Sequence, residues 1–333
     1  MNALIIETAF LGDIIISLGV ARELKRLVPA SRVTYLVRPD AVEIVGACPD
    51  VDEVIPFDKR DTESGRVGIM HKARDLNARD FDAVILLHGS RRSQTLCSYL
   101  RAPVKVGFGF MTQALLTNSV EDAGWKNRYE RAILPITALF EDVDITAIPR
   151  LDCPTLESVT AFRQKFSQIV AIAPGSVWET KKWGDVKFAR LAAELTNRNI
   201  GVIVIGTESD RPSGSRIRSL SNPDTVLDLT GKTTLLESGG AIGAASLLVA
   251  NDSAPAHLAV AVGTPVISIF GPTVPAFGFA PPEERGEVVE IDNIWCRPCT
   301  SHGSHVCPIY THDCMESIGV TMVMDRITNV LAS

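Results

Sequence analysis

Residues 249–273 read VANDSAPAHLAVAVGTPVISIFGPT, a polar turn between two apolar segments, and this stretch decides the fold. Leu247–Ala250 is expected to be a buried strand, 256–262 to begin an apolar helix, and 266–270 to form the next strand. The Asn, Asp and Ser residues at 251–253 favour a helix start, whose free backbone N–H groups and positive dipole end attract phosphate. In an open α/β sheet, polar turns after neighbouring strands form the ligand-binding edge. Ordinary capping of the helix is the alternative interpretation.

Length, composition and charge set the class of protein. A chain of 333 residues is too long for one typical core and indicates two domains. The net charge of −6 argues against a nucleic-acid binder, because such a protein needs a basic face. The N-terminus lacks the basic start of a secretion signal, and no apolar run reaches the roughly 18 residues of a membrane helix. We therefore expect a cytoplasmic protein.

Apolar segments of strand length alternate with helical patterns along the chain, which predicts parallel sheets with crossover helices. The stretch Ile148–Pro154, with prolines near both ends, is the expected linker. We expect an N-terminal doubly wound domain at 1–155, a C-terminal one at 156–315, and a final helix within 316–333, for which packing on the first domain is one option. The two domains are expected to face each other across a cleft that holds small molecules.

Individual elements can also be predicted. Strands are expected at 3–6, 33–37, 53–55, 83–87 and 104–106, and then at 169–173, 202–205, 225–227, 247–250, 265–270 and 288–291. A longer helix near Tyr129–Phe140 should be kinked or split, because Pro135 lacks the N–H that the helix requires.

The turn after the first strand, residues 7–13, places a glycine and a carboxylate where the next helix starts. Gly12 permits a tight bend, and Asp13 begins or caps the helix while it points toward a ligand. A carboxylate there can act as a general base toward a substrate hydroxyl. A plain N-cap is the alternative role of Asp13.

Two turns of the second half carry candidate donor-binding residues. Residues 174–183 mix small, basic and aromatic side chains, and Ser176 together with a lysine can hold a diphosphate, the lysine acting as a point charge. Glu208 follows the strand at 202–205, where Rossmann-type domains bind a ribose. Solvated side chains are the alternative for both turns.

The first half carries a candidate basic patch for an anionic acceptor. Arg91 and Arg92 follow a buried strand, and Arg101 and Lys105 lie nearby in the sequence. Gly12, Arg91, Arg92 and Lys105 are the expected acceptor-binding residues. A solvated helix start is an equally good interpretation of the arginines.

The sequence lacks the motifs of several other enzyme classes. Gly231-Lys232-Thr233 is not the end of a P-loop, because Val226 stands where the first glycine must be. No zinc-protease His-Glu-x-x-His and no hydrolase Gly-x-Ser-x-Gly occurs in the sequence. These absences count against an ATPase, a zinc protease and a serine hydrolase.

Four of the seven cysteines crowd near the C-terminus: Cys296, Cys299, Cys307 and Cys314. Such a set can bind zinc structurally, although its spacing is not the symmetrical double Cys-x-x-Cys typical of zinc sites. Free thiols or a redox-sensitive pair are the alternatives, and nothing in the pattern indicates catalysis by a metal.

Four ordered motifs together resemble glycosyltransferase family 9, the heptosyltransferases of lipopolysaccharide synthesis. These motifs are Leu11-Gly12-Asp13, Ala173–Gly175 with Lys181-Lys182-Trp183, the block 251–257, and Phe270–Thr273. The resemblance spans nearly the whole chain and implies a GT-B fold, with two Rossmann-like domains that hold the acceptor and the nucleotide-sugar respectively. It implies inverting transfer of a heptose from ADP-L-glycero-D-manno-heptose to an anionic sugar of the inner core, with no cofactor required.

The resemblance also implies residue roles. Asp13 matches the base that deprotonates the acceptor hydroxyl. Lys181 matches the lysine that stabilises the leaving diphosphate, although the adjacent Lys182 leaves that choice open. Many family members have glycine at position 254, so an alanine there would be strained if the position needs a positive φ. The matched donor loop comprises Asp252, Ser253, Ala254 and His257.

Two alternatives to a heptosyltransferase remain at this point. A nucleotide-sugar epimerase can share the two-domain architecture, and a non-catalytic protein can keep the fold and bind a sugar-nucleotide or glycan. The expected partners are ADP-heptose and a lipopolysaccharide core acceptor, with no nucleic acid. A lipid-linked acceptor would add a peripheral contact with the inner membrane.

Overall fold

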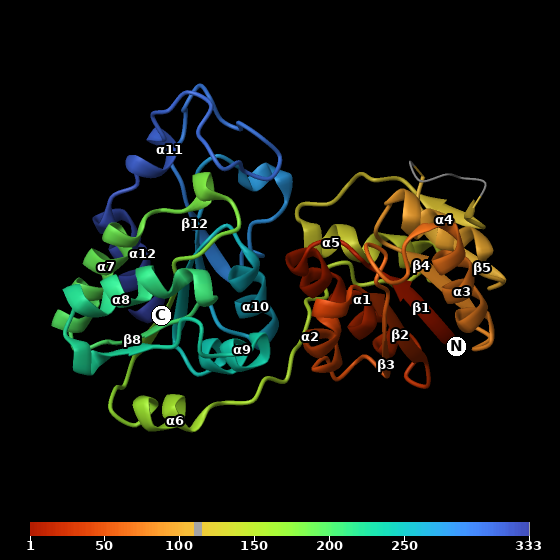
Figure 1. Ribbon diagram of the computed structural model, residues 1–333, viewed down its shortest axis with the longest axis horizontal. Coiled ribbons are helices and arrows are strands. Elements are labelled where there is room, and N and C mark those ends of the chain that lie inside the picture. The colour runs from red at the N-terminus through yellow and green to blue at the C-terminus, as the bar shows by residue number, and fades with distance from the viewer. Residues whose placement is uncertain (110–114, 333) are drawn as a thin grey trace. The chain divides into compact units, whose positions relative to one another are not determined.

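A computed structural model describes residues 1–109 and 115–332 (Figure 1). The chain divides into two compact units, Met1–Leu151 and Asp152–Ser333. This division falls within the stretch expected to be the linker, slightly before the boundary expected at residue 155.

The first unit is built on one parallel six-stranded sheet with the order β3-β2-β1-β4-β5-β6. The order reverses between β1 and β4, and Ile6 of β1 pairs with both Leu36 and Leu86, so the central strands end level with one another. The strands are β1 (Asn2–Ile6), β2 (Arg32–Val37), β3 (Glu53–Pro56), β4 (Ala83–Leu86), β5 (Val104–Phe108) and β6 (Asn118–Val120). The helices are α1 (Leu11–Leu27), α2 (Val42–Gly46), α3 (Gly65–Asn77), α4 (Arg91–Tyr99) and α5 (Arg128–Ile133).

The second unit has the same topology. Its sheet is again parallel, in the order β12-β11-β10-β7-β8-β9, and it reverses between β7 and β10. The strands are β7 (Ile169–Ala173), β8 (Gly201–Val204), β9 (Val226–Asp228), β10 (Leu247–Asn251), β11 (Val266–Ile269) and β12 (Gly286–Val289). The helices are α6 (Glu157–Arg163), α7 (Asp185–Asn197), α8 (Arg211–Leu220), α9 (Leu235–Gly243), α10 (Ala254–Val262), α11 (Asp313–Glu316) and α12 (Val320–Ala332). Both units have the strand order of Rossmann folds, which confirms the predicted fold class of two doubly wound units.

The central strands are buried because crossover helices cover the sheets (Figure 1). Every residue of β7 and β10 is buried, which explains why these strands are continuous apolar runs rather than alternating ones. Trp183 anchors the core of the second unit. It is almost fully buried, packs edge-on against Phe188, and donates from its indole nitrogen to the Ile318 carbonyl at 2.9 Å.

The C-terminal helix belongs to the second unit. α12 packs on α7 and on strands β10 to β12, and Figure 1 shows it beside α7. Its buried residues Val323, Met324 and Ile327 join the core cluster that contains Trp183. The apolar face of this helix therefore completes the core of its own unit.

Pro135 acts as predicted, because α5 ends at Ile133 and a 3-10 helix follows at Leu134–Ala138. β6, α6 and α8 were not expected from the sequence pattern. α8 begins Arg211-Pro212 and buries only Gly214 and Ile217, so it shows little helical periodicity. Across the described ranges, none of the helices is both long enough and apolar enough to cross a membrane.

The start of the second unit packs closely on α9. A Cβ at Gly240 would lie 1.8 Å from the Pro154 carbonyl oxygen, whereas a Cβ at Gly243 would meet Val262 at an ordinary 3.7 Å. We predict that Gly240→Ala lowers the free energy of unfolding by roughly 1–3 kcal/mol, because backbone must move to admit the methyl group. Gly243→Ala is the matched control and should be neutral or slightly stabilising. Equal effects of the two variants in thermal unfolding would contradict this packing.

Candidate functional site

Each sheet reverses its strand order at its centre, and two polar turns lie side by side there. In the first unit these turns follow β1 and β4, and in the second unit they follow β7 and β10. Such a reversal leaves a crevice outside the carboxyl ends of the strands, which is where open α/β sheets bind ligands. In both units, side chains from the two turns are in direct contact.

Lys181 and Asp252 form the contact in the second unit. Lys181 ends the 3-10 helix Glu179–Lys181 in the loop after β7, and its Nζ lies 2.6 Å from Oδ2 of Asp252, directly after β10. Thr273, which follows β11, donates from Oγ1 to the same carboxylate oxygen at 2.7 Å. All three residues are buried. Since an ammonium group has three N–H donors, Lys181 keeps donors for a ligand.

Asn251, the last residue of β10, joins the two turns around this pair. Its side-chain carbonyl accepts from the Trp183 N–H at 3.0 Å, and its amide nitrogen donates to the carbonyls of Pro174 at 2.8 Å and Gly175 at 3.3 Å. Asn251 is fully buried. It therefore fixes both ends of the loop that carries Lys181.

Helix α10 starts immediately beyond the pair. Ser253 is its N-cap residue but does not cap it, because its hydroxyl donates to the Asn251 carbonyl at 3.2 Å. The positive helix end therefore lies beside Lys181 and Asp252, as an anion site requires. Ala254 is the first helical residue and has no positive φ. The strain that an alanine would suffer at a left-handed position therefore does not arise.

The other predicted donor residues are placed differently. His257 is buried on α10, and burial lowers its pKa to about 4, so its ring is neutral at pH 7. Ser176 is half-buried in the loop after β7 and accepts from the Trp178 N–H at 3.3 Å. Glu208 lies beyond β8, is exposed, and forms an ion pair with Arg211 at 2.8 Å. The structure brings Glu208 to the same sheet edge but gives its carboxylate a different partner.

The corresponding contact in the first unit is a polar network around Thr8. Its hydroxyl accepts from the Lys59 ammonium at 2.7 Å and lies 2.9 Å from Nδ1 of His88 and 3.0 Å from the Ser93 hydroxyl. Lys59 also lies 3.3 Å from His88 Nδ1. Within the described part of the chain, no carboxylate lies within ion-pair distance of Lys59. The groups that contact the Lys59 ammonium are therefore uncharged.

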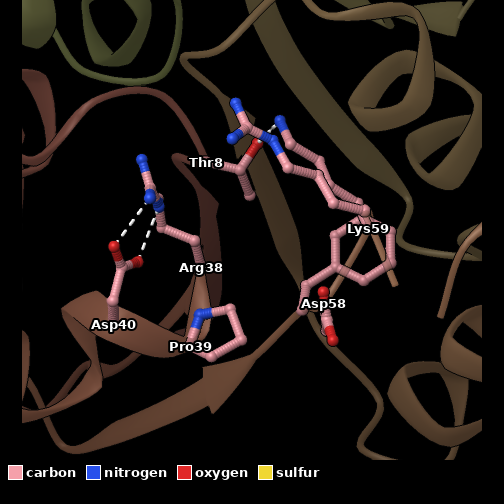
Figure 2. A pocket seen from close by; sticks show the side chains of 8 residues that line it. Thr8, Arg38, Pro39, Asp40, Asp58 and Lys59 are labelled. Carbon is pink, nitrogen blue, oxygen red and sulfur yellow. Dashed lines mark hydrogen bonds and ion pairs between the residues drawn. The ribbon is translucent and has the colours of Figure 1, made fainter. Parts of the chain in front are cut away.

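A cavity of about 200 Å³ opens beside this network, and Figure 2 shows its lining. Arg38 is paired there with Asp40, while the Asp58 carboxylate points away from the Lys59 ammonium. Burial lowers the pKa of Lys59 to about 8; the charge of Glu7 opposes this shift, and three nearby arginines add to it. Burial also lowers the pKa of His88 to about 4. The cavity lining is Thr8, Arg38, Pro39, Asp40, Phe57, Asp58, Lys59 and Arg60.

Glu7 and Asp13 lie in the same turn. Glu7 is buried and accepts from the Ala9 N–H at 2.8 Å. Burial and, to a smaller extent, the negative charge of Asp13 raise the pKa of Glu7. The Ala9 hydrogen bond and the charges of Lys59 and Arg131 lower it, and the net value is about 8. Asp13 lies in the first turn of α1, whose N-cap is Phe10, so Asp13 is not the N-cap.

The predicted acceptor residues do not form one group. Gly12 is the second residue of α1, so it does not make the expected bend. Arg91 and Arg92 begin α4 and are exposed, and Arg92 contributes to the electrostatic environment of Lys59. Lys105 pairs with Val84 near the beginning of β5, away from the carboxyl edge of the sheet. Lys59 was not among the residues expected from the sequence, although its position just after β3 could have indicated it.

The four clustered cysteines are free thiols. Burial raises the pKa of Cys314 to about 11, and Cys299, Cys296 and Cys307 contribute in the same direction. Among residues 1–109 and 115–332, no group of three or more His, Cys, Asp or Glu side chains is placed to hold a metal ion.

Comparison with known families decides the class of this site. The family described as "Glycosyltransferase family 9 (heptosyltransferase)" matches residues 69–309, well over half of the chain. The chain belongs to this family. It is accordingly a glycosyltransferase, and the alternatives of an epimerase and a non-catalytic protein are set aside.

Relatives of this family 9 enzyme span most or all of the chain. It is 24% identical to lipooligosaccharide heptosyltransferase 2 of Haemophilus influenzae, with all of both chains covered. It is 27% identical to lipopolysaccharide heptosyltransferase 1 of Pseudomonas aeruginosa, covering 90% of this chain and 86% of the relative. Among solved structures, the Escherichia coli ADP-heptose heptosyltransferase II aligns with a TM-score of 0.78 at 21% identity, covering 100% and 99%. That likeness shows the shared fold.

The buried Glu7 leads to a prediction on stability. Because the pKa of Glu7 rises on folding, the native state binds the carboxyl proton of Glu7 more tightly than the unfolded chain does. Protonated Glu7 therefore makes its full contribution to the free energy of unfolding below about pH 4.5. This contribution is lost as the pH rises toward 8. We predict that Glu7→Gln, which stays neutral, gains thermal stability relative to the wild type between pH 5 and pH 8. The measurement is the difference in unfolding midpoint across that range. A difference that does not change with pH would contradict a buried neutral Glu7.

Proposed function

We propose that this enzyme transfers a heptose from ADP-L-glycero-D-manno-heptose to an anionic sugar of the lipopolysaccharide inner core, with inversion at the anomeric carbon. The observation that carries the proposal is the Lys181–Asp252 pair at the N-terminal end of α10. Family membership supports it, and so do the relatives, which are named as lipopolysaccharide and lipooligosaccharide heptosyltransferases.

The second unit supplies the donor chemistry. As the bond between the heptose and the diphosphate breaks, negative charge builds on the leaving phosphate oxygen. Lys181 donates to that oxygen from its remaining N–H groups, and the dipole of α10 stabilises the same charge. Asp252 keeps the ammonium in place through its ion pair, and the Thr273 hydroxyl holds the Asp252 carboxylate. Ser176, Ser253 and His257 line the same edge and are proposed to contact the donor.

The first unit supplies the base. Asp13 takes the proton of the acceptor hydroxyl, the hydroxyl oxygen forms its bond to the anomeric carbon, and the electron pair of the broken bond leaves with ADP. The neighbouring Glu7 is protonated near pH 7, because burial raises its pKa to about 8. Asp13 is therefore the carboxylate proposed to act as base, and Glu7 is not.

Lys59 is proposed to bind an anionic group of the acceptor. It is a buried ammonium without a carboxylate partner in the described structure, it borders a cavity of about 200 Å³, and the guanidinium charges of Arg38, Arg60 and Arg92 act on it. Arg92 is the one predicted acceptor residue that this arrangement includes. Lys59 thereby replaces Lys105 as the lysine expected to contact the acceptor.

The first experiment separates donor binding from transfer. We predict that Asp13→Asn binds ADP as the wild type does but loses transfer by about 10²- to 10⁴-fold, because only the base is removed. Lys181→Met should weaken ADP binding in calorimetric titration. Lys182→Met is its matched control, because Lys182 is more exposed and pairs with Glu179. Undiminished transfer by Asp13→Asn, or release of sugar from the donor at the same rate without acceptor, would overturn the proposal.

The second experiment follows the charge of Lys59. Because its pKa lies near 8, the ammonium loses its charge as pH rises through that value, and acceptor binding should weaken between pH 7 and pH 9. We predict that Lys59→Met raises the acceptor KM about tenfold or more at pH 7 and leaves the ADP affinity unchanged. Lys126→Met, an exposed lysine of the same unit, is the charge-matched control. An acceptor KM that responds equally to both substitutions would exclude Lys59 from the site.

A further inference from the structure

The cysteine-rich loop, residues 294–314, holds the residue next to Lys181. The Thr180 hydroxyl donates to the Ser304 carbonyl at 2.9 Å and accepts from the Ser304 N–H at 2.9 Å. The Thr180 N–H donates to the same carbonyl at 3.0 Å. From the other end of the loop, Nε2 of His312 donates to the Thr180 carbonyl at 2.7 Å, since a carbonyl can only accept. Thr180 is thus bound to the loop through its side chain and through both of its backbone groups.

The same loop holds the other side of the ion pair. Arg297 donates to the Thr273 carbonyl at 2.7 Å and forms an ion pair with Glu290 at 2.7 Å. The Cys299 N–H donates to the Pro272 carbonyl at 3.0 Å. Thr273 is the residue whose hydroxyl binds the Asp252 carboxylate. One loop therefore fixes the neighbours of both Lys181 and Asp252.

The loop also touches Lys181 itself. Gly303 has a φ of +98°, and a Cβ there would lie 2.9 Å from the Trp178 Cβ and 3.1 Å from the Lys181 Cγ. The rings of Trp178 and His305 lie 5.2 Å apart, which brings a second loop side chain against this segment. The loop backbone therefore lies against the alkyl chain of Lys181 with no space for a methyl group.

We propose that the cysteine-rich loop positions the Lys181 ammonium for the diphosphate of the donor, with Thr180 and Gly303 as its positioning contacts. This inference rests on the proposed function, in which Lys181 binds that diphosphate. The four cysteines lie within residues 294–314 but contribute none of these contacts through their side chains. The loop backbone and the side chains of Arg297, His305 and His312 make them.

Two pairs of variants test this role. Thr180→Val keeps the shape of the side chain but loses both hydroxyl hydrogen bonds, and Thr180→Ser keeps them. Gly303→Ala adds a methyl group against Lys181, and Gly263→Ala is its control, because Gly263 has a φ of +82° and no atom within 4 Å of its missing Cβ. We expect Thr180→Val and Gly303→Ala to weaken ADP binding about tenfold, while Thr180→Ser and Gly263→Ala bind ADP as the wild type does.

A double-mutant cycle with Lys181→Met separates positioning from a general loss of structure. If the loop acts through Lys181, Thr180→Val should have little further effect on ADP affinity once Lys181 is replaced. Equal effects in both backgrounds would overturn the inference. If Lys181→Met weakens ADP affinity but Thr180→Val and Gly303→Ala leave it unchanged, the loop inference is overturned and the proposed function stands. An unchanged affinity of Lys181→Met would overturn both. If Thr180→Val does not fold, the Gly303→Ala and Lys181→Met cycle decides.

Discussion

The buried ion pair of Lys181 with Asp252 is the constraint on which the second unit depends. A charged pair removed from water is stable only when its geometry is good and its remaining hydrogen-bonding capacity is used. The structure meets this condition in two ways: Thr273 donates a second hydrogen bond to the same carboxylate oxygen, and Asn251 fixes the loop that carries Lys181. Three segments distant in sequence therefore meet at one carboxylate, and removing either charge would leave the other buried and uncompensated.

The first unit uses the same topology for a different electrostatic purpose. Its turns also meet where the strand order reverses, but the buried cation there, Lys59, has hydroxyl and imidazole partners instead of a carboxylate. The nearby Glu7 is protonated near neutral pH and so does not cancel that charge. The second unit thus holds Lys181 in an ion pair with Asp252, while the first unit places the charge of Lys59 beside a cavity. This difference agrees with a donor site in one unit and an acceptor site in the other.

The sequence predicted the topology well because both sheets are made of continuous apolar strands, and such runs are visible without a structure. It also indicated Lys181 and Asp252, which lie in turns directly after strands. β6 and α8 could not be found in this way, because an exposed three-residue strand and a helix with two buried residues carry little periodicity. The role of Lys59 depends on which side chains surround it, and the contacts of residues 304 and 312 with Thr180 span more than 120 residues. Neither follows from local pattern.

Those long-range contacts bear on how the enzyme is made. Lys181 is synthesised near the middle of the chain, but its neighbour Thr180 is held by Ser304 and His312. The core of the same unit is completed by α12, which ends at Ala332. The strands described in the first unit all lie before residue 121, so this unit can fold while synthesis continues. The proposed nucleotide site, by contrast, can be assembled only after almost the whole chain has left the ribosome. A chain that ends early would therefore carry a folded first unit without an ordered Lys181–Asp252 pair.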